Sequence, residues 1–153
     1  MNSASTKSEY LLLFRGTDWH RSLTSGEIKE VMIAWMAWSD RLVDEGRSKA
    51  RRSLSGTGKI ISGKGGKVSD GPYAEAKEAV AGYFLLEVDD LEEAIEIARE
   101  CPTLAHGATV EVRPMPARCL ASQLAAAPVE AIADFMVGGD PSVLRAAMAE
   151  NTF

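Results

Sequence analysis

Two segments of this 153-residue chain are apolar at almost every position, and they limit the folds open to it. Residues 10–14 read Tyr-Leu-Leu-Leu-Phe, and residues 80–88 read Val-Ala-Gly-Tyr-Phe-Leu-Leu-Glu-Val. Such runs are typical of strands that are covered on both faces. The first is too short for a signal-peptide core or a membrane span, and no other stretch is long enough. We therefore expect a cytoplasmic protein with no membrane partner.

Two helices are predicted from caps and apolar spacing. Thr24 and Glu27 have the capping-box spacing, and Gly46 is placed to end the helix in a left-handed conformation, so a helix is expected over residues 24–45. Its apolar stripe comprises Ile28, Val31, Met32, Trp35, Trp38 and Leu42, and both tryptophans are expected in the core. Asp90 and Glu93 repeat the capping pattern for a second helix, which ends before Pro102.

The other strands are shorter. Residues 47–69 carry basic charges, no acid and several glycines, and we expect strands near 48–54, 58–62 and 67–69, with a turn at 63–66 joining the last two. A final strand is expected at 109–113. The order strand, helix, strands, helix, strand predicts an α+β domain over residues 9–115. Residues 1–8 are expected to be disordered, and residues 116–153 to form a helical C-terminal extension of two or three short helices.

Two helices can cover only one face of this sheet, so the second face needs another cover. An identical subunit related by two-fold symmetry would supply one, and residues 117–153 folding back would supply another. We favour the homodimer. If Val110 and Val112 face the helices, then Glu111 and Arg113 point to the second face, where they line a wet cleft or form a structural ion pair.

Composition narrows the classes of ligand. The formal net charge is -5, and the basic segment 47–69 lacks interleaved aromatic residues, so a nucleic-acid partner is not expected. Cys101 and Cys119 form no CxxC pair, and His20 and His106 are too isolated for a zinc site. The glycine-rich run at 63–67 does not lead into a helix, as a phosphate loop would. We expect neither a metal nor a cofactor.

The segment from Asp70 to Glu78 is the most unusual in the chain. Asp70 can accept bonds from backbone amides in an Asx-turn, Gly71 and Pro72 shape a turn, and Tyr73 presents an aromatic face with a polar tip. Glu75, Lys77 and Glu78 follow within one turn of chain. Two interpretations stay open: Asp70 only shapes the turn, or Asp70 or Glu75 acts as a general base.

Asp70-Gly71-Pro72-Tyr73-Ala74-Glu75 with Lys77-Glu78 resembles the signature of the YCII-related proteins of the DGPF type. The resemblance extends through Gly82-Tyr83-Phe84, Asp89-Asp90-Leu91, Cys101-Pro102 and Val110 to Pro114, and covers about residues 9–115. It implies a ferredoxin-like antiparallel sheet of the dimeric α/β-barrel type. Some relatives carry a histidine–aspartate pair with the histidine on the first helix. The first helix here has no histidine, so that pair is not carried over.

Two functions are weighed on this basis. The first is the binding of a small molecule in a cleft near the dimer interface, with enzymatic activity left open. The residues expected to line it are Asp70, Gly71, Pro72, Tyr73, Glu75, Lys77, Glu111 and Arg113. The alternative is a regulatory or interaction protein with a protein partner, because the DGPF type is associated with sigma-factor-dependent transcription. The separation of the basic segment 47–69 from the acidic stretch 75–100 favours this alternative.

Overall fold

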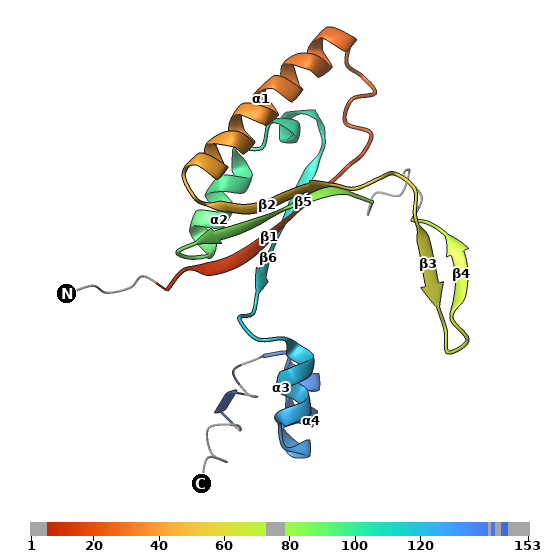
Figure 1. The fold of residues 1–153 in the computed structure, drawn as a ribbon, viewed down its shortest axis with the longest axis vertical. Helices are drawn as coiled ribbons and strands as arrows, with labels where there is room; N and C mark the ends of the chain where they lie inside the picture. The colour runs from red at the N-terminus through yellow and green to blue at the C-terminus, as the bar shows by residue number, and fades with distance from the viewer. Residues whose placement is uncertain (1–5, 73–78, 141, 143–144, 147–153) are drawn as a thin grey trace, which may run out of the picture. The chain divides into compact units, whose positions relative to one another are not determined.

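The computed structural model describes residues 6–72, 79–140, 142 and 145–146 of the chain. The chain divides into two compact units, Met1–Met115 and Pro116–Phe153, each treated by itself below. The first unit contains six strands, two α-helices and one short 3₁₀ helix (Figure 1). In chain order they are β1 Ser8–Arg15, α1 Ser25–Asp44, β2 Ser48–Ser53, β3 Lys59–Ser62, β4 Lys67–Asp70, β5 Val80–Val88, α2 Leu91–Arg99, η1 Pro102–His106 and β6 Thr109–Met115.

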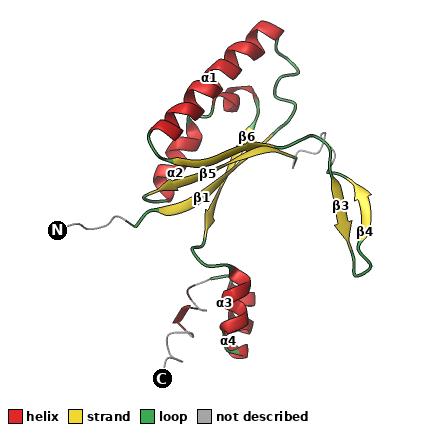
Figure 2. Cartoon of the chain, in the orientation of Figure 1, coloured by secondary structure: helices red, strands yellow, loops and turns green. Residues whose placement is uncertain are grey.

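Four strands form the main sheet, in the order β2-β5-β1-β6. All neighbouring pairs are antiparallel, and Leu12 of the central strand β1 faces Phe84 of β5 and Val112 of β6. Helices α1 and α2 lie on the same side of this sheet (Figure 2). The predicted α+β, ferredoxin-like fold is confirmed, and the strand bounds differ from the predicted ones by at most about two residues.

The core lies between the sheet and its two helices. Alternate residues of β1 and β5 point toward the helices, and Leu12 and Leu86 are 0% exposed. The buried cluster contains Tyr10, Leu12, Phe14, Trp38, Leu42, Phe84, Leu86, Val88, Ala94, Ile97, Ala98 and Cys101. Val110 and Val112 pack against it, as predicted. The residues of β1 and β5 on the second face, such as Leu11, Leu13 and Leu85, are only half-buried.

The helix ends follow the sequence signals. Thr24 accepts from the backbone N–H of Glu27 at 3.2 Å, and the Glu27 carboxylate accepts from the N–H of Thr24 at 2.7 Å, which completes the predicted capping box. Asp90 accepts from the backbone N–H of Glu93 at 2.9 Å at the start of α2. Gly46 follows α1 with a φ of +71°, a conformation that glycine adopts without steric cost.

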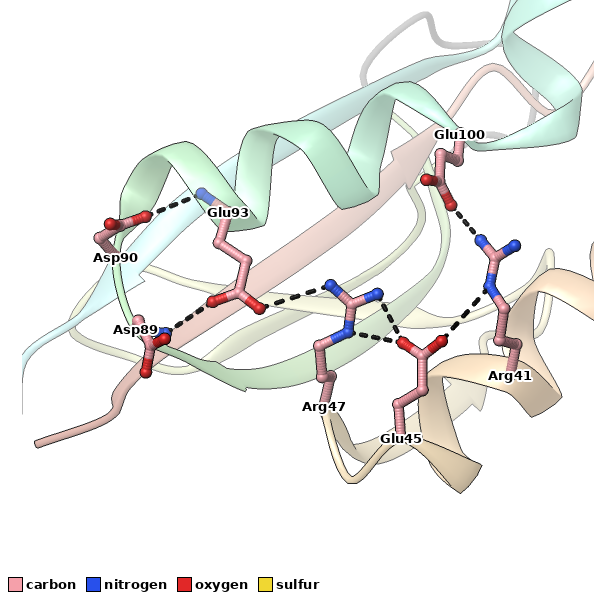
Figure 3. Close-up of polar contacts among 7 residues, drawn as sticks. All are labelled: Arg41, Glu45, Arg47, Asp89, Asp90, Glu93 and Glu100. Carbon is pink, nitrogen blue, oxygen red and sulfur yellow. Dashed lines mark hydrogen bonds and ion pairs between the residues drawn. The ribbon is translucent and has the colours of Figure 1, made fainter. Parts of the chain in front are cut away.

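A chain of ion pairs ties the C-terminal end of α1 to α2 (Figure 3). Arg41 of α1 pairs with Glu45 at 3.8 Å and with Glu100 at the end of α2. Arg47 donates through Nε and Nη2 to Glu45 at 2.8 and 2.5 Å, and its Nη1 lies 3.4 Å from Glu93 of α2. These contacts fix the segment that links α1 to β2.

Strands β3 and β4 form a separate two-stranded sheet (Figure 1). The predicted turn is present, because the N–H of Gly66 donates to the carbonyl of Gly63 at 3.1 Å. Ile61 pairs with Val68 across this hairpin, and they are 70% and 60% exposed. The hairpin therefore leaves an apolar pair open to water.

Within its described residues, the second unit has the short helices α3 Leu120–Ala126 and α4 Val129–Gly138. Pro128 caps the start of α4, and Gly139 ends it with a φ of +67°. Ala131 and Phe135 form its small core with Leu124 and Ala127. The helical character predicted for this segment is confirmed, although Pro141 lies outside the described residues. Across both units, none of the described helices has the length and apolar content needed to span a bilayer.

Gly82 allows the closest backbone approach in the main sheet. It pairs with Ser53 of β2 and Phe14 of β1, and an added Cβ would lie 2.6 Å from the Arg52 carbonyl oxygen. The obstacle is backbone rather than a flexible side chain, so a larger residue would require the two strands to separate.

We expect Gly82→Ala to lower the free energy of unfolding by about 1–3 kcal/mol, the usual cost of overpacking. Gly56→Ala is the matched control, because Gly56 has open space around its Cα, and it should change stability by less than about 1 kcal/mol. Urea unfolding of both variants and the wild type measures the difference. Equal stability of Gly82→Ala and the wild type would contradict the close approach.

Candidate functional site

The apolar stripe of α1 is covered along only part of its length. In the C-terminal half Trp38, Ser39 and Leu42 are buried. In the N-terminal half the stripe residues Ile28, Val31, Met32 and Trp35 are only half-buried. Figure 1 shows the cause: α1 is inclined to the sheet, with its C-terminal end near β2 and its N-terminal end turned away from the strands.

A cleft of about 480 Å³ lies beneath this inclined part of α1. Its walls come from α1, the adjoining ends of β1, β2 and β5, the segment after β1 and the η1 region. The lining residues are Phe14, Arg15, Gly16, Trp19, Met32, Trp35, Met36, Ser39, Arg51, Arg52, Ser53, Ala81, Gly82, Phe84, Thr103 and Ala108. Gly82 contributes no side chain, and this leaves room between α1 and the sheet.

Aromatic rings form one wall of the cleft. Phe14 contacts Trp35 edge-to-face with ring centroids 4.7 Å apart, and it contacts Phe84 at the same distance. The ring centroids of Trp35 and Phe84 are 5.6 Å apart. Trp38 stacks on Phe84 with centroids 5.3 Å apart. Edge-to-face and offset contacts of this kind hold rings in fixed orientations. The wall is therefore a preformed apolar surface.

Arg51 supplies the charged group of the cleft. It faces the helices, because it pairs with Phe84 in the register of β2 and β5. Its Nη1 donates to Ser39 Oγ and to Asp40 Oδ1, both at 2.6 Å, so α1 holds the guanidinium in place. Arg52 also borders the cleft, but it pairs with Tyr83, so its side chain belongs to the second face of the sheet.

The described lining of the cleft is made of apolar, hydroxyl and guanidinium side chains. None of the described residues that line it is an aspartate, glutamate, histidine or cysteine. Such groups carry most general acid–base and nucleophilic chemistry. Throughout the described ranges, no cluster of three or more histidine, cysteine, aspartate or glutamate side chains could hold a metal ion.

The predicted residues Asp70, Gly71 and Pro72 lie elsewhere, at the base of the β3–β4 hairpin. The Asp70 carboxylate pairs with Lys59 across the hairpin, and the N–H of Gly71 donates to the Gly58 carbonyl at 3.1 Å. Pro72 has no N–H to complete an Asx-turn with Asp70. A second hollow of about 560 Å³ lies here, lined by these residues and by residues 56–59. Among the described residues the Asp70 carboxylate is thus used in a cross-strand ion pair with Lys59 and not in the predicted Asx-turn.

The structure places the other predicted residues apart from this hairpin or does not describe them. Tyr73, Glu75 and Lys77 lie outside the described residues. Glu111 and Arg113 lie on β6, an edge strand of the main sheet, and Nη1 of Arg113 donates to Oε1 of Glu111 at 3.2 Å. The predicted set is therefore not gathered at one site among the residues that the structure describes.

Glu111 is also bound by a residue that the sequence did not suggest. Arg15 donates to it through Nε at 3.0 Å and Nη2 at 2.8 Å. These bonds, followed by the bond from Arg113, hold the pKa of Glu111 below its usual value. The structural ion pair considered for this strand is present, with a second arginine added.

The chain can now be compared with known proteins. A family model for the YCII-related domain matches residues 10–116. The chain belongs to the YCII-related domain family. The match spans the main sheet of the first unit except the first two residues of β1, includes the Asp70-Gly71-Pro72 turn, and ends before the C-terminal helices. A search of curated proteins finds no match. The resemblance to YCII-related proteins of the DGPF type is thereby confirmed at the level of the family.

Sequence reasoning missed the cleft beside α1 of this YCII-related chain. Trp35 packs against the core, as predicted, but it also lines the cleft, and nothing in the sequence singled out Arg51 or Ser39. The apolar stripe of α1 extends beyond the part that is buried against the sheet, and the sequence does not reveal the inclination that uncovers it. The face on which Arg51 lies depends on the irregular register between Ser48 and Ala50, which the sequence does not reveal.

We expect Glu111→Gln to lower the melting temperature at pH 7 by a few degrees at most, because both ion pairs need the carboxylate and are partly exposed. A carboxyl with a depressed pKa stabilises the fold above its unfolded-state pKa, and this contribution is lost as the pH falls. The difference between variant and wild type should therefore shrink below about pH 4, the ordinary glutamate range. Thermal melts from pH 7 to pH 3 measure it.

Glu30→Gln, at an exposed position of α1, is the control and should show no such pH-dependent difference. A Glu111→Gln effect that stays constant down to pH 3 would contradict the proposed linkage.

Proposed function

We propose that this YCII-related protein binds a small, ring-containing apolar molecule in the cleft beside α1, and that it does so as a cytoplasmic homodimer. The observation that carries the binding proposal is the half-buried stripe of α1 over an open cleft of about 480 Å³. Ligand pockets for small molecules typically have volumes of about 300–1,000 Å³ and are mostly apolar, with a few fixed polar groups.

Covering this surface would be favourable. Met32, Trp35 and Met36 all line the cleft, and Met36 is 51% exposed. Removal of apolar surface from water contributes about 25 cal/mol per Å². A flat ligand that separates Trp35 from water would gain this free energy without rearranging the fold, because the rings of the wall already contact one another.

Binding is favoured over catalysis by the chemistry of the lining. The described lining residues offer guanidinium, hydroxyl and aromatic groups but no side chain that titrates near neutral pH. An enzymatic reaction would have to draw on groups such as the predicted Tyr73 and Glu75, which lie outside the described residues. The proposed cleft also lies on the helix side of the sheet, not on the second face where Glu111 and Arg113 are found.

The neutral fluorescent probe N-phenyl-1-naphthylamine tests the cleft. We expect saturable binding to the wild type and about tenfold weaker binding to Met36→Glu, because a carboxylate would replace an apolar contact worth about 1–2 kcal/mol. Ile33→Glu is the matched control: Ile33 is 61% exposed on the same helix but does not line the cleft, and its variant should bind as the wild type does. Equal binding by all three proteins would contradict the location, and no binding by the wild type would contradict the function.

The homodimer is proposed from the second face of the main sheet. Leu11, Leu13, Tyr83 and Leu85 lie there, half-buried, at the centre of the sheet. The ion pairs of Glu111 with Arg15 and Arg113 lie on the same face toward β6. An apolar centre beside satisfied charges is the composition of a protein–protein interface, and a two-fold contact would place it against an identical surface.

Sedimentation equilibrium of the full chain should give the mass of a dimer. Leu13→Glu should shift it toward the monomer, because a carboxylate would be buried without a partner. Ile33→Glu, on α1, should remain a dimer. A wild-type monomer would contradict this part of the proposal and leave the cleft unaffected, since the cleft lies on the opposite side of the sheet.

The regulatory alternative keeps its support from the charge division of the sequence. The exposed pair Ile61 and Val68 adds an apolar surface within the basic segment, which suits a protein partner. The regulatory alternative assigns no role to the cleft beside α1, and we therefore favour ligand binding.

A further inference from the structure

Arg51 differs from Arg15 and Arg47 in which side of its guanidinium is used by the chain. The planar guanidinium has two donors on one edge, Nε and Nη2, which match the two oxygens of a carboxylate. Arg15 presents this edge to one carboxylate oxygen, Oε2 of Glu111, with Nε at 3.0 Å and Nη2 at 2.8 Å. Arg47 presents the same edge to Oε2 of Glu45 at 2.8 and 2.5 Å.

In Arg51 this edge is open. Its contacts to Ser39 and Asp40 both use Nη1. Neither Nε nor Nη2 of Arg51 has a hydrogen-bond or ion-pair partner within the described part of the chain. The guanidinium is therefore held on one side by α1, and its carboxylate-binding edge is left for another acceptor.

The Nη1 side of the Arg51 guanidinium is bonded to a rigid part of the fold. Ser39 is 2% exposed, and it lies in the part of α1 that packs on the sheet. Arg51 comes from β2, where it pairs with Phe84 of the aromatic wall. Both Arg51 and Ser39 line the cleft. A group anchored from two elements loses little conformational freedom when a ligand binds, and this favours recognition.

The charges around the cleft allow a negative ligand. Arg51 is the arginine whose side chain faces the helix side of the sheet, whereas Arg52 pairs with Tyr83 and Arg15 is bound to Glu111 on the second face. Among the described residues no carboxylate lines the cleft, and Asp40, which shares Arg51, is not a lining residue. A bound carboxylate would therefore meet the Arg51 guanidinium and no like charge in the lining.

We propose that Arg51 binds the carboxylate of a flat aromatic acid whose ring lies against Trp35 and Phe14. This inference rests on the proposed function, because it names the class of ligand for the same cleft. The open edge of the guanidinium supplies two parallel hydrogen bonds, and the ring wall supplies the apolar contact. A cleft of about 480 Å³ has room for one ring or a fused pair.

A matched pair of probes tests the assignment. 2-Naphthoate and 2-naphthamide share the ring and nearly the same shape, and they differ in charge. Isothermal titration of the wild-type protein should show the acid binding at least tenfold more tightly than the amide. In Arg51→Gln this preference should disappear, while the affinity for the amide stays within about twofold of the wild-type value, since the ring wall is unchanged.

Two further variants keep the test decisive. Arg51→Lys retains the charge but not the two-donor edge, and should lose most of the preference. Arg99→Gln is the control: Arg99 is exposed on α2, pairs with Glu96 and does not line the cleft, so the preference should be intact. If Arg51→Gln fails to fold, Arg51→Lys and the wild-type comparison still decide.

The outcomes separate the two proposals. If neither probe binds the wild type, the proposed function fails. If both bind equally, or if the preference for the acid survives in Arg51→Gln and Arg51→Lys, the cleft stands but the role of Arg51 is overturned. 2-Naphthyl phosphate is the third probe, and binding tighter than that of 2-naphthoate would overturn the assignment of a monocarboxylate.

Discussion

Helix α1 is fixed to the sheet through its C-terminal half, and the open cleft follows from this attachment. Trp38 and Leu42 pack in the core, and Arg51 of β2 bonds to the same part of the helix. Past the end of α1, Arg47 links Glu45 to α2. The N-terminal half has its own capping box at Thr24, which satisfies the helix end without any contact to the sheet. The N-terminal half of α1 can therefore extend beyond the part that packs on the sheet, and its apolar side is only partly covered.

The elements of this fold could be predicted because their signals are local. Caps, glycine positions and periodicity depend on neighbours within a few residues, and Thr24, Asp90 and Gly46 have the roles that their types suggest. The family resemblance then supplied the arrangement of strands. The angle between α1 and the sheet has no local signal. Periodicity placed Trp35 on the apolar side of the helix, but it could not show that Trp35, although it contacts Phe14 and Phe84, is only partly covered by the sheet.

The Asp70-Gly71-Pro72 turn shows why an unusual motif is weak grounds for assigning a site. Gly71 has a φ of +150°, and an added Cβ would lie 2.6 Å from a carbon of Ile60. Its N–H bonds to the Gly58 carbonyl at 3.1 Å. The geometry at the base of the β3–β4 hairpin thus requires glycine, and Asp70 is used by Lys59. A rare combination of residues can reflect the conformation of the backbone as readily as the chemistry of a ligand.

The same ion-pair chemistry has different consequences on the two sides of the main sheet. On the second face, Oε2 of Glu111 takes up the Nε and Nη2 donors of Arg15 and Oε1 accepts from Arg113, so this network is closed within the chain. On the helix side, Asp40 and Ser39 occupy one nitrogen of Arg51 and leave its bidentate edge open. Charges that are satisfied within the chain, as at Glu111, can border a subunit contact. An arginine that is held in place but keeps donors available, as Arg51 is, can recognise a ligand. The first helix adds Trp35, Met36 and Ser39 to this cleft and no histidine, which is why our proposal starts from ligand binding there.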